Sequence, residues 1–303
     1  MKRPQRIHTY ATAGYDSARW DGFQPRRGDI IVATPIKSGT TWTQMICALL
    51  VHQSPELPEP LTRLSRWLDR YTDPIDELLA YFEAQPFRRI IKTHTPLDGL
   101  PYFEEVSYVF CGRDPRDVFL SMCDHVTNMS EASMADIARR AGLSEPPPIP
   151  ENPNELFPLW LTIGEQPWMR DGFPFGSVLD LTLAYWEFRE LPNLFFLHYA
   201  DLTARLDAEM RRLSAFLEIP VDETTWPRLV EAATFQSMKE KADDVAPGAH
   251  LGEWKKPSDF FRMARMGQWR EVLTGENQEL YEQVTRERLE PELKRWLEHG
   301  RRD

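Results

Sequence analysis

The chain has 303 residues, of which 42% are hydrophobic and 27% charged, enough to bury one large domain or two small ones. The formal net charge of −11 argues against a nucleic-acid partner, because affinity for a phosphate backbone comes from Lys and Arg. No apolar run is long enough to span a bilayer, and the N-terminus lacks the apolar segment of a signal peptide. The three cysteines form no CxxC pattern, so we expect reduced thiols, a cytoplasmic location and no integral membrane segment.

The first predicted elements are a buried strand of mostly β-branched residues at 30–33, a turn containing Pro and Gly, and a helix over 41–52. A helix N-terminus has free backbone N–H groups and a dipole that favours an anion. The turn adds a positive charge, hydroxyl donors and a glycine that lets a ligand approach the backbone, in Lys37, Ser38, Gly39, Thr40 and Thr41. These groups predict a phosphate-binding turn; the alternative is an ordinary strand–helix turn whose hydroxyl groups cap the helix. Lysine precedes Ser-Gly-Thr-Thr, so this is not a Walker A motif.

A second short strand is predicted at Ile90 and Ile91, after a short helix over 76–84, and Pro96 ends it. Lys92 and His94 are two residues apart, so on a strand they point to the same side. In an open α/β sheet, ligands bind outside the carboxyl ends of the strands. We therefore interpret the pair as functional rather than as ordinary surface residues.

The third predicted strand, at 106–113, runs into Asp114 and Pro115, which are typical of a helix start. Arg113 is thereby placed at a strand end that faces a helix N-terminus, which would make a second anion site. Ser121 follows eight residues after Arg113, in the helix. Taken alone, the segment is better explained by a solvent-facing Arg and a packing Ser.

Residues 127–177 are rich in proline and break the alternation of strands and helices, so we expect a long irregular segment without long helices. Aromatic residues are interleaved with the prolines, namely Phe157, Trp160, Trp168, Phe173 and Phe175. Such a segment is often a lid or a binding loop, and its aromatics suggest an apolar acceptor pocket. The alternative is a hydrophobic flap that simply closes the core.

The remaining pattern predicts a fourth strand at 193–199 and, at the C-terminus, one charged surface helix over 279–297. Other helices are expected at 182–189, 202–217, 226–233 and 235–241, followed by a loop at 254–274 that wraps the site. Strands alternate with helices throughout, which predicts the α/β class with a central, mostly parallel sheet flanked by helices. Without repeats or linkers, residues 1–303 are expected to form a single domain with 127–177 as an insertion.

Several segments together resemble the cytosolic, PAPS-dependent sulfotransferase family, as a bacterial-like member. They match in residue type, order and spacing, and are Lys37–Trp42, Lys92–His94, Arg113–Asp117 with Ser121, His198–Leu202 and Thr234–Lys239. The resemblance runs from Phe23 to Glu279. It implies a sulfotransferase domain with a P-loop-like loop that binds the phosphosulfate end of PAPS (3′-phosphoadenosine 5′-phosphosulfate). The reaction would give a sulfate ester and PAP, the 3′,5′-bisphosphate.

The resemblance also assigns roles. His94 would be the general base, Lys37 would stabilise the leaving phosphate oxygen, and Lys92 would hold the transferring sulfonate. Arg113 and Ser121 would bind the 3′-phosphate, and Ser121 would also restrain the loop lysine until the acceptor arrives. The hydroxyl groups of the 37–42 loop would hold the 5′-phosphate. Trp42 and Phe235 would pack on the adenine. The remaining donor-binding residues would be Gly39, Tyr199, Thr234 and Arg262.

Two departures from the family pattern concern the segment after Phe260. Arg262 is kept, but Met263 and Ala264 replace a Lys and a Gly, which removes one cation from the 3′-phosphate site. Residues 270–279 follow the family's dimer motif only in part, so a homodimer is an open expectation. The alternatives are a P-loop-type kinase that uses ATP and a PAP-binding sensor without turnover. No metal is expected, and the small-molecule acceptor would be an apolar or amphiphilic alcohol or amine, such as a phenol, a lipid or a glycolipid.

Overall fold

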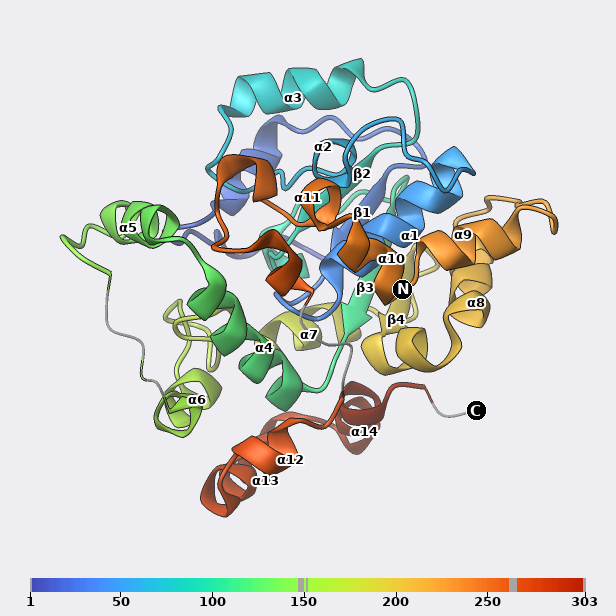
Figure 1. The fold of residues 1–303 in the computed structure, drawn as a ribbon. Helices are drawn as coiled ribbons and strands as arrows, with labels where there is room; N and C mark the ends of the chain where they lie inside the picture. The colour runs from blue at the N-terminus through green and yellow to red at the C-terminus, as the bar shows by residue number, and fades with distance from the viewer. Residues whose placement is uncertain (1, 147–149, 151, 262–265, 302–303) are drawn as a thin grey trace.

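The computed structural model describes residues 2–146, 150, 152–261 and 266–301. Its centre is a four-stranded parallel sheet with the strand order β2-β1-β3-β4 (Figure 1). The strands span Ile30–Ala33 (β1), Ile90–Thr93 (β2), Ser107–Gly112 (β3) and Leu194–His198 (β4). The α/β class and the parallel sheet predicted from the sequence are thereby confirmed.

Alternate residues of the buried strands point to opposite faces of the sheet. In β1, Ile30 and Val32 pack with α1 (Thr40–His52), α8 (Tyr199–Phe216) and α9 (Trp226–Ala232). Ile31 and Ala33 pack on the other face with Trp20, with α3 (Ile75–Ala84) and with α7 (Leu179–Trp186). Helices therefore cover both faces, as a parallel sheet requires, and leave its carboxyl edge to form a site.

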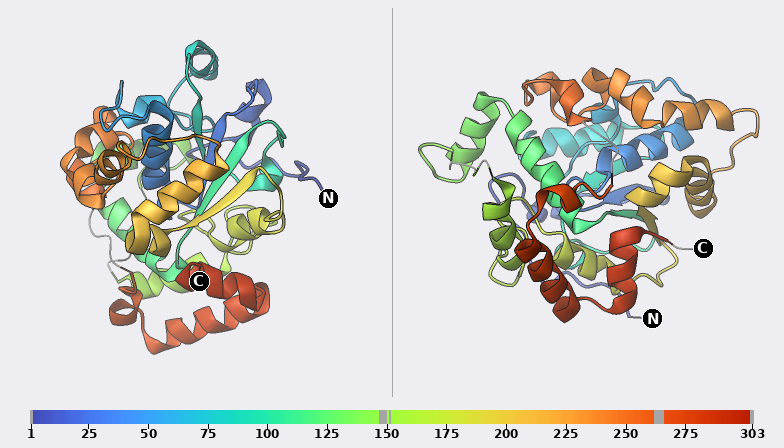
Figure 2. Two further views of the ribbon diagram at one scale, coloured as in Figure 1. Left: turned by 90° about the vertical axis from the view of Figure 1, so that its right-hand side faces the viewer. Right: turned by 60° about the horizontal axis from the view of Figure 1, so that its bottom comes forward.

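The other helices lie around this core (Figures 1 and 2). They are α2 (Leu61–Leu64), α4 (Pro115–Asn128), α5 (Glu131–Arg140), α6 (Pro153–Thr162), α10 (Phe235–Glu240), α11 (Ala242–Val245), α12 (Trp269–Val272), α13 (Gly275–Arg288) and α14 (Pro291–His299). Short 3-10 helices occur at Ser17–Gly22, Leu97–Gly99, Ala249–Leu251 and Pro257–Phe260. The helix start predicted at Asp114 is confirmed, because its side chain caps α4.

Two sequence predictions about the elements are wrong. The 127–177 segment is not irregular throughout, because it contains the helices α5 and α6. Ser130 and Asn152 cap these helices, and Pro153 occupies the first turn of α6, where a missing N–H costs nothing. The single helix predicted over 279–297 is in fact two helices, because Pro291 starts α14 after α13 has ended.

The five aromatic residues named in the 127–177 segment do not share one role. Phe157 and Trp160 are fully buried in a cluster between α4, α6 and the C-terminal helices. Trp168 stacks on His8 with 4.3 Å between ring centroids, and Phe173 is exposed. Phe175 alone among the five reaches the cavity described below. The segment therefore closes part of the core and also lines part of a cavity, whereas its role toward an acceptor stays a prediction.

Three structural features relate to the expected compartment and cofactors: the cysteines, the lengths of the helices and the grouping of possible metal ligands. Cys47, Cys111 and Cys123 are free thiols. Among the helices that are described, none combines the length and the apolar character needed to cross a membrane. The described residues also contain no group of three or more His, Cys, Asp or Glu side chains arranged to hold a metal ion. A cytoplasmic location and a metal-free reaction stay predictions.

Candidate active site

A cavity of about 470 Å³ opens at the carboxyl ends of β1, β2 and β3. Most of the residues singled out from the sequence line it, namely Lys37, Gly39, Thr40, Thr41, Trp42, Lys92, His94, Arg113, Ser121, Tyr199 and Phe235. They come from segments up to almost two hundred residues apart, and the parallel sheet collects them because its strands all end at one edge. Ser38 and Thr234 do not line the cavity, and Arg262, Met263 and Ala264 lie outside the described residues.

The β1–α1 turn is shaped by two residues with positive φ, Lys37 at 65° and Gly39 at 104°. A side chain on Gly39 would lie 3.1 Å from the Tyr199 ring and 3.3 Å from Cys111 Sγ, so both conformation and space favour glycine here. The hydroxyl groups of Thr34 and Thr40 are 2.6 Å apart and tie the two ends of the turn together. The turn therefore presents backbone N–H groups of α1 to the cavity, as an anion site requires.

Ser38 differs from its neighbours in the turn. Its side chain is fully buried, and its Oγ has no hydrogen-bond partner within the described part of the chain. Thr234 also lies off the cavity, but its hydroxyl has a partner, because it accepts the N–H of Ser237 and caps α10. The predicted segments therefore reach the cavity, but these two side chains do not line it, and their predicted contacts with the donor stay predictions.

Lys37 and Arg113 meet where the two strand–helix turns come together. Arg113 donates through Nη1 to the backbone carbonyl of Lys37 at 3.0 Å, and its guanidinium lies over the Tyr199 ring at 4.3 Å. Arg113 Nε is buried and has no partner among the described residues. Lys37 Nζ lies 4.0 Å from the centre of the Phe260 ring. Burial, with help from Arg113 and Lys92, lowers the pKa of Lys37 to about 7, so this pair is electrostatically prepared for an anion.

Lys92 and His94 lie on the same side at the end of β2, as predicted, and both pack on Trp67. His94 Nδ1 donates to the carbonyl of Thr34 at 2.6 Å, because a carbonyl can only accept. This fixes the tautomer and leaves Nε2 as the unprotonated nitrogen. Burial lowers the pKa of His94 well below its ordinary value, so the imidazole is neutral near pH 7. Lys92 Nζ lies 4.6 Å from the Trp67 ring centre, and burial together with Arg70 lowers its pKa to about 7.

Aromatic rings form the wall beside these charges. Trp42 donates through Nε1 to the carbonyl of Ala233 at 2.8 Å, which holds its ring against the start of α10. Trp42 and Tyr199 meet edge to face with 5.4 Å between centroids. Phe235 lies on the same wall and meets Phe261 edge to face, with 6.1 Å between the ring centroids. A flat heterocycle could stack on such a wall while its phosphates reach the turns.

The family model of the sulfotransferase domain matches residues 27–292 of this chain, which is most of its length. This chain belongs to the sulfotransferase family. Three relatives that resemble it are glycolipid sulfotransferases of mycobacteria. The protein of Mycobacterium bovis (strain BCG / Pasteur 1173P2) is 38% identical over 97% of this chain and 94% of its own length. Those of Mycobacterium tuberculosis strains are 37% identical over the same shares.

The fold of this sulfotransferase also resembles solved structures. A mouse sulfotransferase complexed with PAP matches with a TM-score of 0.69 at 20% identity, covering 92% of this chain and 90% of the other. A retinol dehydratase in complex with androsterone and PAP matches with a TM-score of 0.70 at 21% identity, over 93% and 90% of the two chains. These similarities extend the family assignment to the three-dimensional arrangement of the sheet and helices.

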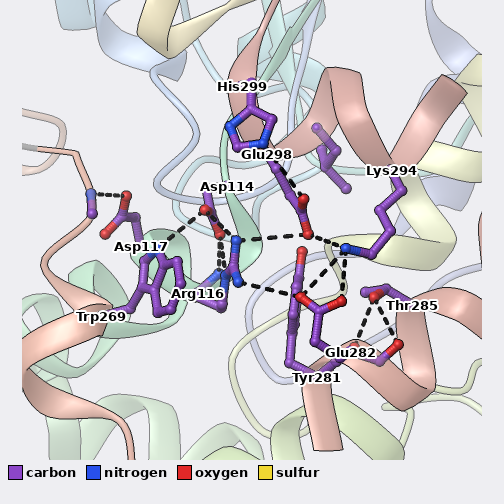
Figure 3. Close-up of polar contacts among 12 residues, drawn as sticks. Asp114, Arg116, Asp117, Trp269, Tyr281, Glu282, Thr285, Lys294, Glu298 and His299 are labelled. Atoms are coloured by element: carbon purple, nitrogen blue, oxygen red, sulfur yellow. Dashed lines mark hydrogen bonds and ion pairs between the residues drawn. The ribbon is translucent and has the colours of Figure 1, made fainter. Parts of the chain in front are cut away.

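A polar network supports the turn that carries Arg113 in the sulfotransferase (Figure 3). The guanidinium of Arg116 lies between two rings, 3.6 Å from the centre of Trp269 and 4.2 Å from that of Tyr281. It forms a bidentate ion pair with Asp114, in which Nε donates to Oδ1 at 3.0 Å and Nη2 donates to Oδ2 at 2.9 Å. Asp114 caps α4 and also accepts the indole N–H of Trp269 at 3.1 Å. The network therefore joins the β3–α4 turn to the C-terminal helices.

The cavity is also lined by residues that sequence reasoning missed: Tyr15, Trp67, Arg70, His125, Glu165 and Glu253. One of them carried a readable signal, because His125 follows Ser121 by four residues and so shares its face of α4. The others come from separate loops, whose positions only the folded chain defines. Trp254 and Phe260 belong to the 254–274 segment, which was predicted to wrap the site and does contribute to its wall.

Proposed function

We propose that this sulfotransferase transfers the sulfonate group of PAPS to a hydroxyl group of an amphiphilic, glycolipid-like acceptor. One observation carries the proposal. The neutral imidazole of His94 and the buried amino groups of Lys37 and Lys92, whose pKa values are lowered to about 7, line one cavity beside the aromatic rings of Trp42, Tyr199 and Phe235. A base beside a cluster of buried basic side chains suits the transfer of an anionic group to an alcohol.

The residues present fit a bisphosphorylated nucleotide. The positive φ values of Lys37 and Gly39 turn the backbone toward the cavity, and Arg113 keeps a buried N–H without a partner in the described chain. The rings of Trp42 and Phe235 would hold the adenine. Arg113 and Ser121 would bind the 3′-phosphate, and the hydroxyls of Thr40 and Thr41 the 5′-phosphate. Bound PAPS supplies the sulfonate and leaves as PAP.

The chain's own groups then have separate tasks. Nε2 of His94 takes the proton of the acceptor hydroxyl as the acceptor oxygen bonds to sulfur. Lys37 stabilises the negative charge that develops on the phosphate oxygen as its bond to sulfur breaks, and Lys92 holds the sulfonate oxygens in line. Ser121 lies on α4 across the cavity and, in its proposed second role, restrains Lys37 before the acceptor arrives.

The acceptor side of the cavity combines apolar and polar surface. Met134, Ile137 and Phe175 line it, and so do the ion pair of Arg70 and Glu253 and the carboxyl group of Glu165. Pockets of this kind bind the apolar part of a ligand by burial and orient its polar part with a few placed groups. Together with the printed activity of the mycobacterial relatives, this favours a glycolipid over a small phenol.

A transfer assay with radiolabelled PAPS tests the proposal. We expect incorporation into glycolipids that exceeds incorporation into simple phenols, and none with ATP and Mg²⁺ in place of PAPS. Stabilisation of the fold by PAP without turnover on any acceptor would instead support a PAP-binding sensor, and phosphorylation by ATP would support a kinase. A homodimer through residues 270–279, a lid function for 127–177 and a cytoplasmic location remain parts of the proposal, to be checked by ultracentrifugation, lid truncation and cell fractionation.

A further inference from the structure

Asp69 is a fully buried carboxylate behind the segment that carries His94. Its Oδ2 accepts the hydroxyl groups of Thr93 and Thr95, each at 2.6 Å. It also accepts the indole N–H of Trp20 at 3.2 Å. The two threonines are the immediate neighbours of His94 in the sequence, one on each side. A single oxygen atom therefore fastens the backbone both before and after the histidine.

The clamp is reinforced at the peptide that follows. The N–H of Thr95 donates to the hydroxyl of Thr93 at 3.0 Å, and Tyr185 donates to the carbonyl of Thr95 at 3.2 Å. With both flanking residues held, the His94 ring can reach the carbonyl of Thr34 only in a narrow range of orientations. The bond of 2.6 Å from Nδ1 to that carbonyl depends on this range.

A buried carboxylate is a costly way to hold two hydroxyl groups. Asp69 forms no ion pair among the described residues, its second oxygen lacks a partner there, and burial raises its pKa. Its charge does act on the active site, because it opposes the effects of burial and of Arg70 that lower the pKa of Lys92. Costly buried charges next to reacting groups are common where geometry matters for catalysis.

We propose that Asp69 is a positioning residue for His94. Its carboxylate clamps Thr93 and Thr95 and so keeps Nδ1 of the imidazole on the Thr34 carbonyl and Nε2 available to the acceptor hydroxyl. This inference rests on the proposed role of His94 as the base. Asp69 touches neither the donor nor the acceptor, so it acts on the rate of transfer and not on the binding of PAP.

Steady-state kinetics of Asp69 and threonine variants test the clamp. In Asp69→Ala we expect kcat to fall roughly 100-fold, the scale of a misplaced catalytic group, with the Kd of PAP nearly unchanged. Thr93→Val and Thr95→Val should each lower kcat by a smaller factor, and Asp69→Ala should add little to the double valine variant. Asp69→Asn should recover most of the rate, because its amide oxygen can still accept both hydroxyls.

Trp20→Phe is the matched control, because it removes the third donor to the same oxygen without touching either threonine. It should cost stability but leave kcat close to that of the wild type. Equal losses of kcat in Trp20→Phe and Asp69→Ala would overturn the proposal, since the effect would then be structural. Should Asp69→Ala fail to fold, unchanged kcat in both valine variants would overturn it in the same way.

A readout without turnover separates this inference from the proposed function. In ¹⁵N-labelled protein, the imidazole of His94, assigned by comparison with His94→Asn, should show a proton fixed on Nδ1. The double variant Thr93→Val/Thr95→Val should show mixed tautomers. A fixed Nδ1 proton in both proteins would overturn the clamp even if sulfonate transfer is confirmed. Loss of the fixed proton in a chain without transfer activity would support the clamp while the proposed function fails.

Discussion

The two halves of the cavity are built in different ways. The half that we propose for the donor comes from the strand–helix turns around Lys37 and Arg113 and from the end of β2 at Lys92, and each of these is a short continuous stretch of sequence. The half that we propose for the acceptor is assembled from distant loops that contribute Tyr15, Trp67 and Glu165. Local backbone geometry defines the first half, whereas only the packing of the whole chain defines the second. In this chain, the proposed donor site could therefore be predicted from motifs, whereas the proposed acceptor site could not.

The halves also differ in charge balance. In the donor half, Lys37 and Lys92 are buried ammonium groups with lowered pKa values, and Arg113 has a buried N–H without a partner in the described chain. The acceptor half contains an internal ion pair, in which Arg70 donates to Glu253 at 2.7 Å. The donor half therefore favours an anionic ligand, whereas the acceptor half contains an ion pair of its own.

The largest expected effect is at the boundary between the halves. His94→Asn should lower kcat by about 10³-fold, within the usual range for general-base catalysis, and leave the Kd of PAP unchanged. His52→Asn is the control, because that histidine packs on Phe87 and does not line the cavity. Rapid-quench kinetics and calorimetry with PAP measure the two quantities. Full activity in His94→Asn would show that His94 is not the base, and that the proton transfer does not take place where we locate the boundary between the halves.

The next effect concerns the support behind the donor half. Arg116 and Asp114 are both buried, so Arg116→Met leaves a carboxylate without its cation and should lower the free energy of unfolding by about 3 kcal/mol. Arg211→Met makes the same chemical change at an exposed pair with Glu223 and should have almost no effect. Urea denaturation compares the variants. Equal stabilities would mean that the network of Figure 3 does not hold the turn.

Within the donor half, the two cations should separate by kinetics. Lys37→Met should lower kcat by roughly 10²-fold, because it removes charge stabilisation at the leaving oxygen. Arg113→Met should mainly raise the Kd of PAP, by about 10-fold or more, because a charge-assisted hydrogen bond contributes roughly 1.5–3 kcal/mol. Single-turnover experiments at saturating PAPS distinguish the two effects. The assignment of roles would be wrong if Lys37→Met weakened PAP binding as much as Arg113→Met.

Much of this donor half was predictable from the sequence. Motif spacing placed Lys37, His94 and Arg113 at strand ends, and the parallel sheet brings such ends together. The predictions failed where side-chain direction or distant packing decides the outcome. Ser38 is fully buried between two residues with positive φ, and Thr234 is used as a helix cap. No local pattern marks Trp67 or Asp69, since their contacts with the 92–95 segment form only on folding.

A pH effect follows from the buried lysines of the donor half. The pKa values of Lys37 and Lys92 fall from 10.5 to about 7, chiefly by burial, so the unfolded chain binds more protons than the folded one between these values. The free protein should therefore gain stability as the pH rises from 7 toward 10.5. PAP should do the opposite, because an anion favours both ammonium forms: its affinity should fall as the pH rises above 7, by at most about tenfold per unit per lysine.

Calorimetry in two buffers of different ionisation enthalpy, at pH 7.5 to 9, measures the protons taken up when PAP binds. Working above pH 7 keeps the phosphates of PAP fully ionised, since their second pKa is about 6. Lys37→Met should take up fewer protons than the wild type. An affinity that does not change with pH would show that these lysines are charged in the free protein. This result would contradict the proposed electrostatic difference between the two halves.

The smallest expected effect belongs to the acceptor half. Burial raises the pKa of Glu165 to about 7, against the opposing hydrogen bond from the Gly176 N–H at 3.2 Å. The folded state therefore binds its proton more tightly than the unfolded state, and the resulting stability is lost as the pH rises from 4.5 through 7. Glu165→Gln imitates the protonated form, so it should melt like the wild type at pH 5 and at a higher temperature at pH 8.

In kinetics, Glu165→Gln should change the KM of a glycolipid acceptor a few-fold at pH 8 and leave the KM of PAPS unaltered, since one hydrogen bond to a charged group is lost on the acceptor side only. Glu287→Gln, on the exposed surface of α13, is the control for loss of a carboxylate. A matching change in the KM of PAPS would mean that Glu165 acts across the whole cavity. The two halves would then be coupled through its charge. The donor site would still be encoded locally and the acceptor site assembled from distant loops, but the two sites would not act independently in the reaction.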